Sequence, residues 1–391
     1  MGKIFNFIIA SVMCVTMAAC DNAYEVKTEI NNENGTVVTE INEISRADEI
    51  FEQMSLEEKV WQMFFVTPED IIDGIDIAVQ AGDATKNAIE TYPVGGIIYF
   101  GQNIESKEQI TEMIANTQKY SKIPLYISVD EEGGRVARLG SKGIVTPHPS
   151  MAQVGATGNI EKARGIGETL GRELNEIGFN VDFAPVADVI TVENNDDIGD
   201  RSIGDDPKLV SDMVSAIVGG MHSENLVATL KHFPSNGSTE ANTHYETGVC
   251  TRTLEEMRGC EFKPFVAGIE AGADMIMVAH MAAINLNDGK NIPSTLSKTV
   301  VTDILRGELK YDGIVISDAL NMGAITSVYK PEDAVIQAID AGVNLVLMSP
   351  DAKNAAKAVI EKAKTDEDFM LKIDESVLRI LKHKEKWGII N

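Results

Sequence analysis

Residues 226–244 read LVATLKHFPSNGSTEANTH and show how the rest of this chain is built. The run LVATL is apolar and β-branched, which predicts a short buried strand. It ends at Lys231 and His232, and a loop rich in serine, threonine, asparagine and glycine follows up to His244. Charged and amide groups directly after a buried strand are hard to explain by packing. The stretch therefore predicts a strand that delivers a polar loop to a pocket.

The same pattern of a short apolar run followed by an amphipathic helical segment repeats along the chain. About eight such units suit a (β/α)8 barrel of the TIM type, and the near-continuous apolar runs agree with a parallel sheet buried on both faces. A doubly wound open sheet is the alternative, but no GxGxxG follows the first strand. The expected strands are 63–67, 96–100, 125–130, 181–186, 227–231, 275–280, 313–318 and 343–348. The expected helices are 107–120, 160–177, 207–225, 254–271, 296–310 and 332–341, with a final packing helix over 366–387.

The N-terminal part of the chain differs from the repeating body. Residues 1–19 carry one lysine, an apolar core too short to span a bilayer and then small residues, which predicts a secretory signal. The sequence MAAC that ends at Cys20 resembles a bacterial lipobox, so we expect Cys20 to be lipidated and the protein to be anchored outside the cytoplasm by this lipid alone. Residues 20–45 are polar and predict a flexible linker. Residues 46–391 form the predicted barrel.

Composition excludes some functions. The 391 residues carry 60 acidic and 34 basic side chains, a formal charge of −26, which argues against nucleic-acid binding. Cys250 and Cys260 could pair outside the cytoplasm, but small packing residues are the simpler interpretation. No metal-ligand spacing or nucleotide fingerprint is visible, so no cofactor is expected.

Polar residues recur where the predicted strands end, which in such barrels is the active-site face. Each has a structural alternative: Asp188 could be a helix N-cap, Arg135 a structural ion pair, and His232 and His280 satisfied buried histidines. Their repetition around the barrel favours one shared pocket. In chain order the residues are Asp130 with Arg135 and Arg138, then Asp188, Lys231 with His232, His280 and Asp318.

Several longer motifs resemble glycoside hydrolase family 3, in particular its β-N-acetylglucosaminidases. The resemblance runs from about residue 45 to the C-terminus. The stretches that carry it are MSLEEKVWQM (54–63), DEEGGRVAR (130–138), KHFP (231–234) with the loop to His244, and ISDALNM (316–322), and GDRSI (199–203) resembles a further sugar-contacting motif. KHFP and SDxLxM at this spacing are far more specific than a single short motif.

The resemblance implies a retaining exo-β-N-acetylglucosaminidase that removes terminal β-linked N-acetylglucosamine from cell-wall muropeptides or chitin-like fragments. Asp318 would be the nucleophile and His244 the acid/base in place of the second carboxylic acid of most retaining enzymes. A histidine suits both roles because its unperturbed pKa is about 6.5. A monomer is the simplest expectation. The residues implied to hold the sugar hydroxyls are Asp130, Arg138, Arg201, Lys231 and His232.

One position departs from the family pattern. The loop usually carries an aspartate two residues before the histidine, and here that position is Asn242. A carboxylate there would fix the imidazole and favour its protonated form, whereas Asn242 can accept a hydrogen bond but brings no charge. Glu240 or Glu246 could serve instead. Two alternatives stay open: a weakened or inactive lipoprotein that binds amino sugars, and a phosphorylase, since a neutral histidine repels incoming phosphate less than a carboxylate does.

Overall fold

The computed structural model describes residues 24–31, 36–43, 45–243 and 245–391. The predicted signal peptide, Cys20 and His244 lie outside these described residues. Within the described part, no helix is long and apolar enough to cross a membrane.

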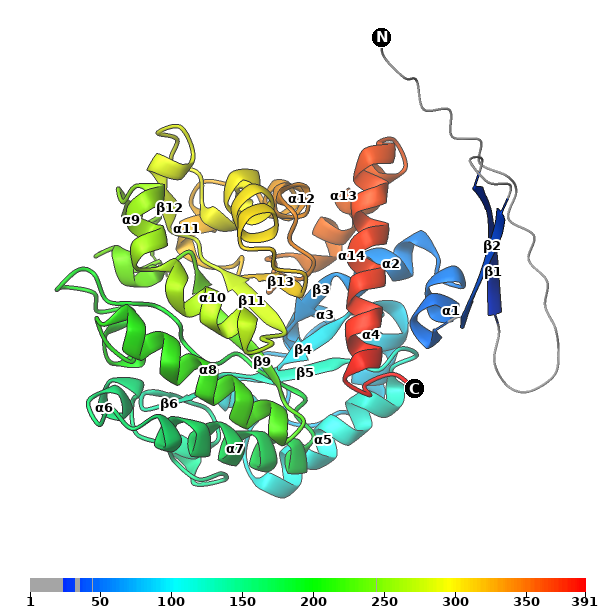
Figure 1. Ribbon diagram of the computed structural model, residues 1–391. Helices are drawn as coiled ribbons and strands as arrows, with labels where there is room; N and C mark the ends of the chain where they lie inside the picture. The colour runs from blue at the N-terminus through cyan, green and yellow to red at the C-terminus, as the bar shows by residue number, and fades with distance from the viewer. Residues whose placement is uncertain (1–23, 32–35, 44, 244) are drawn as a thin grey trace, which may run out of the picture.

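Eight parallel strands form a closed barrel at the centre of the molecule (Figure 1). In sheet order the neighbours are β13-β11-β9-β8-β5-β4-β3-β14. A bridge between Ile316 and Leu345 joins the two ends of this order and closes the ring, so the (β/α)8 prediction is confirmed and the open-sheet alternative is wrong. The strands are β3 (Phe64–Val66), β4 (Gly96–Ile98), β5 (Tyr126–Val129), β8 (Val181–Asp182), β9 (Val227–Phe233), β11 (Met275–Val278), β13 (Ile314–Ser317) and β14 (Val346–Leu347).

Helices cover the outside of the barrel, and local signals set their ends. Helix α7 (Ile160–Ile177) begins after Asn159, whose side chain accepts from the Lys162 N–H, and it stops at Gly178, which is left-handed with φ of 109°. The other helices of the outer layer are α1 (Arg46–Glu52), α2 (Leu56–Gln62), α4 (Asp83–Thr91), α5 (Lys107–Tyr120), α8 (Pro207–Ser223), α9 (Leu254–Gly259), α10 (Phe262–Glu270), η7 (Thr299–Glu308), α12 (Pro331–Ala341), α13 (Ala352–Ala363) and α14 (Glu367–Lys386).

Two sequence-based expectations need correction. The single helix expected over 254–271 breaks at Cys260 and restarts as α10 at Phe262. Glu261 at the break is buried and accepts a hydrogen bond from Ser238 at 2.7 Å, so a tertiary contact overrides the helical pattern there. Within 20–45, where a flexible linker was expected, β1 (Tyr24–Asn31) and β2 (Thr36–Glu43) pair as antiparallel strands. The β-branched residues of TVVTEINE favour this extended pairing.

Cys250 and Cys260 are both free thiols. Cys250 is buried and Cys260 half-buried, and burial raises the pKa of both thiols. This is the packing role that the sequence favoured, because a thiol with a raised pKa is a poor nucleophile.

Helix α14 packs across the end of the barrel opposite the strand carboxyl ends. Asp274 accepts from the Trp387 indole at 2.9 Å and lies 2.6 Å from His222 Nε2. Lys384 is completely buried and donates to Gln62 at 3.0 Å. The C-terminal segment is therefore fixed to the barrel by buried polar contacts.

Candidate active site

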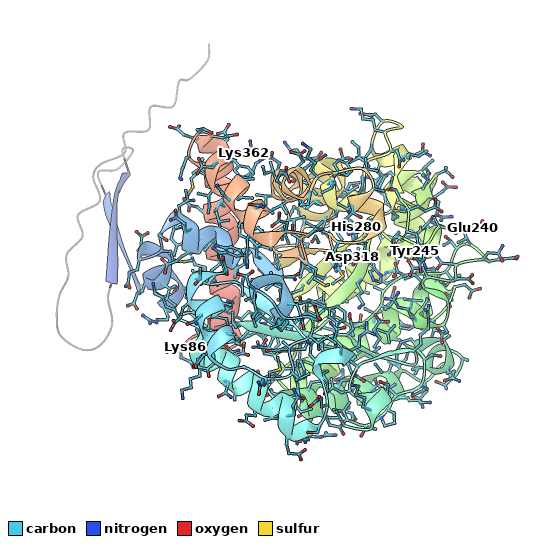
Figure 2. All side chains as sticks on the ribbon, turned by 180° about the vertical axis from the view of Figure 1, so that it is seen from behind. Lys86, Glu240, Tyr245, His280, Asp318 and Lys362 are labelled. Carbon is cyan, nitrogen blue, oxygen red and sulfur yellow. The ribbon has the colours of Figure 1, made fainter. Side chains whose placement is uncertain are left out.

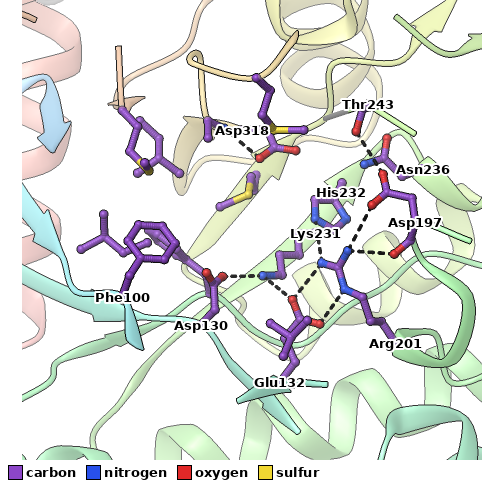
Figure 3. Close-up of a pocket in the computed structure, with 18 of the residues that line it drawn as sticks. Phe100, Asp130, Glu132, Asp197, Arg201, Lys231, His232, Asn236, Thr243 and Asp318 are labelled. Carbon is purple, nitrogen blue, oxygen red and sulfur yellow. Dashed lines mark hydrogen bonds and ion pairs between the residues drawn. The ribbon is translucent and has the colours of Figure 1, made fainter. Parts of the chain in front are cut away.

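A cavity of about 360 Å³ opens at the carboxyl ends of the strands, among the polar residues expected there (Figure 3). One part of its wall is charged and includes Asp130, Glu132, Lys231 and Asp318. Another part is apolar and is formed by Ile98, Phe100, Phe183, Met277, Met322, Leu347 and Met348. A cavity of this kind suits a small ligand with one apolar face and many polar groups.

Strand β9 brings two consecutive side chains to the cavity. In a regular strand Lys231 and His232 would point to opposite faces. The pairing with β11 shifts here, since Met277 pairs with Lys231 and Val278 with Phe233, which leaves His232 as an extra residue. Such a bulge re-aims side chains, and both residues line the cavity. The sequence placed the strand end at residue 231, whereas the strand continues to Phe233.

Five buried or half-buried charges form a continuous network on the cavity wall, and four of them are labelled in Figure 3. The Lys231 ammonium lies 2.9 Å from Asp130 Oδ1 and 2.6 Å from Glu132 Oε1. Arg201 binds Glu132 with two parallel contacts of 2.9 Å. Arg138 reaches the other oxygen of Asp130 at 3.3 Å. The structure thus brings together four of the residues implied to hold the sugar, with Glu132 between two of them.

This network keeps its members ionised. Burial opposes the charge on Glu132, but Arg201 and Lys231 hold the pKa of its carboxyl well below the usual range. Burial also opposes ionisation of Asp130, and Lys231 and Arg138 lower the pKa of that carboxyl as well. In turn, Asp130 and Glu132 raise the pKa of Lys231 against the effect of its burial. The cavity wall therefore presents fixed donors and acceptors over a wide pH range.

Asp188 holds His232 and is not a helix N-cap. Its Oδ2 lies 2.7 Å from His232 Nδ1 and accepts the His232 backbone N–H at 3.2 Å. Because a carboxylate only accepts, Nδ1 is the donor. His232 Nε2 then faces the Arg201 guanidinium at 3.4 Å. His232 is thus oriented toward the charged wall.

Asp318 lies on the cavity wall directly after β13, as the sequence predicted. Its Oδ1 accepts the Ala319 N–H at 2.8 Å. Burial disfavours the carboxylate, but the imidazoles of His232 and His280, this N–H and Lys231 hold the pKa of Asp318 below its ordinary value. His280 is buried outside the cavity lining and contacts the Ala319 carbonyl at 2.9 Å, so it supports the segment that carries Asp318.

The two arginines of the DEEGGRVAR motif have different surroundings. Arg135 pairs with Asp200 at 2.9 Å and donates to the carbonyls of Asp196 and Ile198, which is the structural ion-pair role weighed for it. Arg138 packs over the Phe100 ring, 5.5 Å from its centroid. Among the described residues its buried Nε has no hydrogen-bond partner.

The polar loop after β9 lies along the cavity rim. Asn242 and Thr243 line the cavity, and Thr243 donates to Asp197 at 3.1 Å. Glu240 and Glu246, considered as replacement carboxylates, are both exposed, and Glu240 projects outward from the edge of the barrel (Figure 2). The role predicted for His244 falls outside the described residues.

Sequence reasoning missed Glu132 and Asp197 as cavity residues. A signal existed for Glu132, because residues 130 and 132 share one face of an extended segment. Glu131 points the other way and accepts the N–H groups of Leu139 and Gly140 at 2.8 and 2.9 Å. No local signal identifies Asp197, whose contact with Thr243 spans 46 residues.

The arrangement can hold a polyhydroxylated ring and present one ionised carboxylate to it. Charged donors and acceptors at fixed positions match a set of sugar hydroxyls, and the apolar wall can cover a ring face. An ionised Asp318 can attack or stabilise a carbon that develops positive charge. The described residues contain no group of three or more histidine, cysteine or acidic side chains placed to hold a metal ion.

Comparisons with known proteins agree with this geometry. β-Hexosaminidase A of Pseudoalteromonas piscicida is 33% identical over 287 residues, which are 68% of this chain and 48% of that protein. A family 3 β-N-acetylglucosaminidase from Paenibacillus sp. str. FPU-7 superposes with a TM-score of 0.79 at 32% identity, covering 86% of this chain and 63% of that one. A β-glucoside phosphorylase bound to 2FGlc gives 0.78 at 25% identity, covering 88% and 61%.

This chain therefore spans about half of the β-hexosaminidase A chain and under two thirds of the two solved structures. The model of the glycosyl hydrolase family 3 N-terminal domain matches residues 55–383, which include the whole barrel and every residue of the cavity wall. With a closed barrel, a carboxylate after β13 and a charged wall that includes Asp130 after β5 and Lys231 on β9, the chain belongs to glycoside hydrolase family 3.

Proposed function

We propose that this protein is a retaining exo-β-N-acetylglucosaminidase with Asp318 as its nucleophile. The observation that supports this most is the state of Asp318: an ionised, buried carboxylate on the wall of a cavity whose other charges suit sugar hydroxyls. Attack by Asp318 on the anomeric carbon forms a glycosyl-enzyme and releases the aglycone, and water then breaks that bond with retention.

In this proposal His244 is the acid/base. It gives a proton to the leaving oxygen in the first step and takes one from water in the second. Asp130, Arg138, Arg201, Lys231 and His232 hold the hydroxyls of the terminal sugar. The related β-hexosaminidase A and β-N-acetylglucosaminidase support an amino sugar as that terminal unit.

Trapping tests the nucleophile. The protein is incubated with a 5-fluoro β-N-acetylglucosaminyl fluoride and digested, and the labelled peptide is mapped by mass spectrometry. We expect one label, on Asp318, and no label in Asp318→Ala. Turnover of a chromogenic β-N-acetylglucosaminide without any trapped Asp318 would contradict the retaining mechanism.

A second candidate is phosphorolysis, in which phosphate replaces water in the second step. Its support is the 25% identical β-glucoside phosphorylase of similar fold. Incubation with substrate in phosphate buffer distinguishes the two: hydrolysis gives free N-acetylglucosamine, and phosphorolysis gives the sugar 1-phosphate.

A third hypothesis, in which the protein only binds amino sugars, rests on the neutral Asn242. It predicts binding in calorimetry with no turnover.

We infer from the sequence that the natural substrate lies outside the cytoplasm, in muropeptides or chitin-like fragments, and that the protein is a lipid-anchored monomer. Cys20→Ser tests the anchor, because the variant should move from the membrane fraction to the soluble fraction. Sedimentation of the released protein tests the monomer. A digest of purified muropeptides, analysed for released N-acetylglucosamine, tests the substrate.

A further inference from the structure

A buried hydrogen bond ties the polar loop to a carboxylate from a different part of the chain. Thr243 Oγ1 donates to Asp197 Oδ2 at 3.1 Å. Thr243 is completely buried and Asp197 is 8% exposed, and both line the cavity. Thr243 immediately precedes position 244 in the chain. The contact therefore fixes the backbone next to that position.

The loop is also fixed on the side of Asp318. The N–H of Ala324, in α11 (Gly323–Thr326), donates to the Thr243 carbonyl at 3.3 Å, and Thr247 Oγ1 donates back to the Ala324 carbonyl at 2.9 Å. Between these contacts the Asn242 carbonyl accepts the N–H groups of Tyr245 and Glu246 at 3.0 and 3.2 Å. The loop is thus held on both sides, through Thr243 before position 244 and through Thr247 after it.

Asp197 connects this turn to the charged wall. Its Oδ1 lies 3.8 Å from Arg201 Nη1, which also donates to the Asp197 carbonyl at 3.3 Å. Arg201 is itself held by Glu132 (Figure 3). One carboxylate therefore contacts both an arginine proposed to hold the sugar and the loop proposed to carry the acid/base.

The local charges make Asp197 distinctive. Asn242 is neutral, and the acidic residues of the loop itself, Glu240 and Glu246, are exposed to solvent, where their field is screened. Asp197 is a buried carboxylate in direct contact with the loop. A charge in such surroundings acts more strongly on its neighbours than one in water.

We propose that Asp197 is the positioning residue of the acid/base loop. Through Thr243 it fixes the segment that leads to position 244, and its negative charge lies beside a loop in which residue 242 is a neutral asparagine. This inference rests on the proposed function, in which His244 protonates the leaving group. Asp197 itself touches no reacting atom.

Leaving-group dependence tests this role. A β-linked N-acetylglucosamine disaccharide needs a proton on its leaving oxygen, whereas 2,4-dinitrophenyl β-N-acetylglucosaminide leaves without one. We expect Thr243→Val to lower kcat/KM on the disaccharide about 10- to 100-fold, the usual effect of losing an orienting partner, with little change on the dinitrophenyl substrate. Thr243→Ser keeps the hydroxyl and should restore activity on the disaccharide.

Matched variants separate this role from a general structural one. Thr302→Val removes a half-buried hydroxyl outside this loop, which donates to the Ala341 carbonyl at 2.7 Å, and should affect both substrates alike. Asp197→Asn keeps an acceptor for Thr243 but loses the charge beside Arg201. We therefore expect some loss of kcat/KM on both substrates and a larger loss on the disaccharide. If Thr243→Val melts at a much lower temperature than the wild type, Asp197→Asn is the variant that tests the proposal.

The possible failures are distinguishable. A wild-type protein that turns over neither substrate overturns the proposed function and this inference with it. An active wild type whose Thr243→Val and Asp197→Asn variants lose as much activity on the dinitrophenyl substrate as on the disaccharide overturns the inference alone.

Discussion

One oxygen of Asp188 holds His232 at two points, its backbone N–H at 3.2 Å and its ring Nδ1 at 2.7 Å. The other oxygen accepts the Asn236 N–H at 2.6 Å. All three residues are buried. A single carboxylate therefore fixes both the imidazole on the cavity wall and the start of the polar loop that follows β9.

Replacing Asp188 should weaken sugar binding more than replacing an aspartate on the protein surface. In Asp188→Ala the His232 ring and the Asn236 N–H lose their acceptor, so the ring is free to rotate. We expect kcat/KM for a β-N-acetylglucosaminide to fall about 10- to 100-fold, as for other orienting partners. Because His232 is proposed to hold the ground-state sugar, KM should rise. Steady-state kinetics with a chromogenic substrate measures both parameters.

Asp212→Ala is the control for this experiment. Asp212 pairs with Lys208 on the surface of α8, where both side chains are largely exposed, and such pairs contribute little. Equal kinetic constants for Asp188→Ala and the wild type would show that the orientation of His232 does not matter for the reaction.

Glu132 and its neighbour Glu131 should respond differently to the same substitution. Glu132→Gln removes the charge between Lys231 and Arg201 and leaves two buried cations short of an anion, which costs about 3–5 kcal/mol in comparable pairs. Glu131 accepts only backbone N–H groups, and burial raises the pKa of its carboxyl. Glu131→Gln therefore loses one good acceptor, at a cost of about 1 kcal/mol.

Urea unfolding at neutral pH measures this difference in the free energy of unfolding. At that pH the stabilisation by Glu132 is fully present, because a carboxyl with a lowered pKa stabilises the fold above its usual titration range and loses this effect only as the pH falls. A larger loss in Glu131→Gln than in Glu132→Gln would contradict the network as described.

The barrel and most of its charged wall could be predicted from the sequence because they depend on local patterns. Each apolar run became a barrel strand, and Asp130, Lys231, His232 and Asp318 line the cavity as expected from their places at strand ends. The break at Cys260 could not be predicted, since Glu261 is held there by residues outside the helical segment, such as Ser238.

The contacts that set the orientation of the site were not predictable for the same reason. In sequence Asp188 could be a member of the polar ring or a helix N-cap, and only the fold brings His232 and Asn236, 44 and 48 residues later, to its two oxygens. The pairing of β1 with β2 was missed because a polar composition was given more weight than the β-branched residues in 36–43.

The pH dependence of kcat/KM should show one limb only. The pKa values of Asp318, Asp130 and Glu132 are all lowered, so these carboxyls stay ionised to a pH below about 4, their usual range. The first step needs a protonated histidine, and kcat/KM should decline above about pH 6.5. A chromogenic substrate with a poor leaving group, assayed between pH 5 and 9, measures this profile. A decline of kcat/KM below pH 6.5 in protein that remains folded would contradict the assignment.

Lys384 should make the stability of the fold depend on pH in alkaline solution. Burial lowers the pKa of this ammonium to about 7, and Gln62 is its hydrogen-bond partner. Between about pH 7 and the usual lysine pKa of about 10.4, the unfolded chain binds a proton that the folded protein does not, so the free energy of unfolding rises with pH across this window. Lys384→Met removes the titrating group and should flatten that rise.

Urea unfolding of the wild type and of Lys384→Met at pH 7 and pH 9.5 measures the rise in the free energy of unfolding. Lys382→Met, which changes a half-exposed neighbour on α14, is the control. If wild type and Lys384→Met gain the same stability between the two pH values, Lys384 is charged in the folded protein and its contact with Gln62 is an ordinary ammonium hydrogen bond.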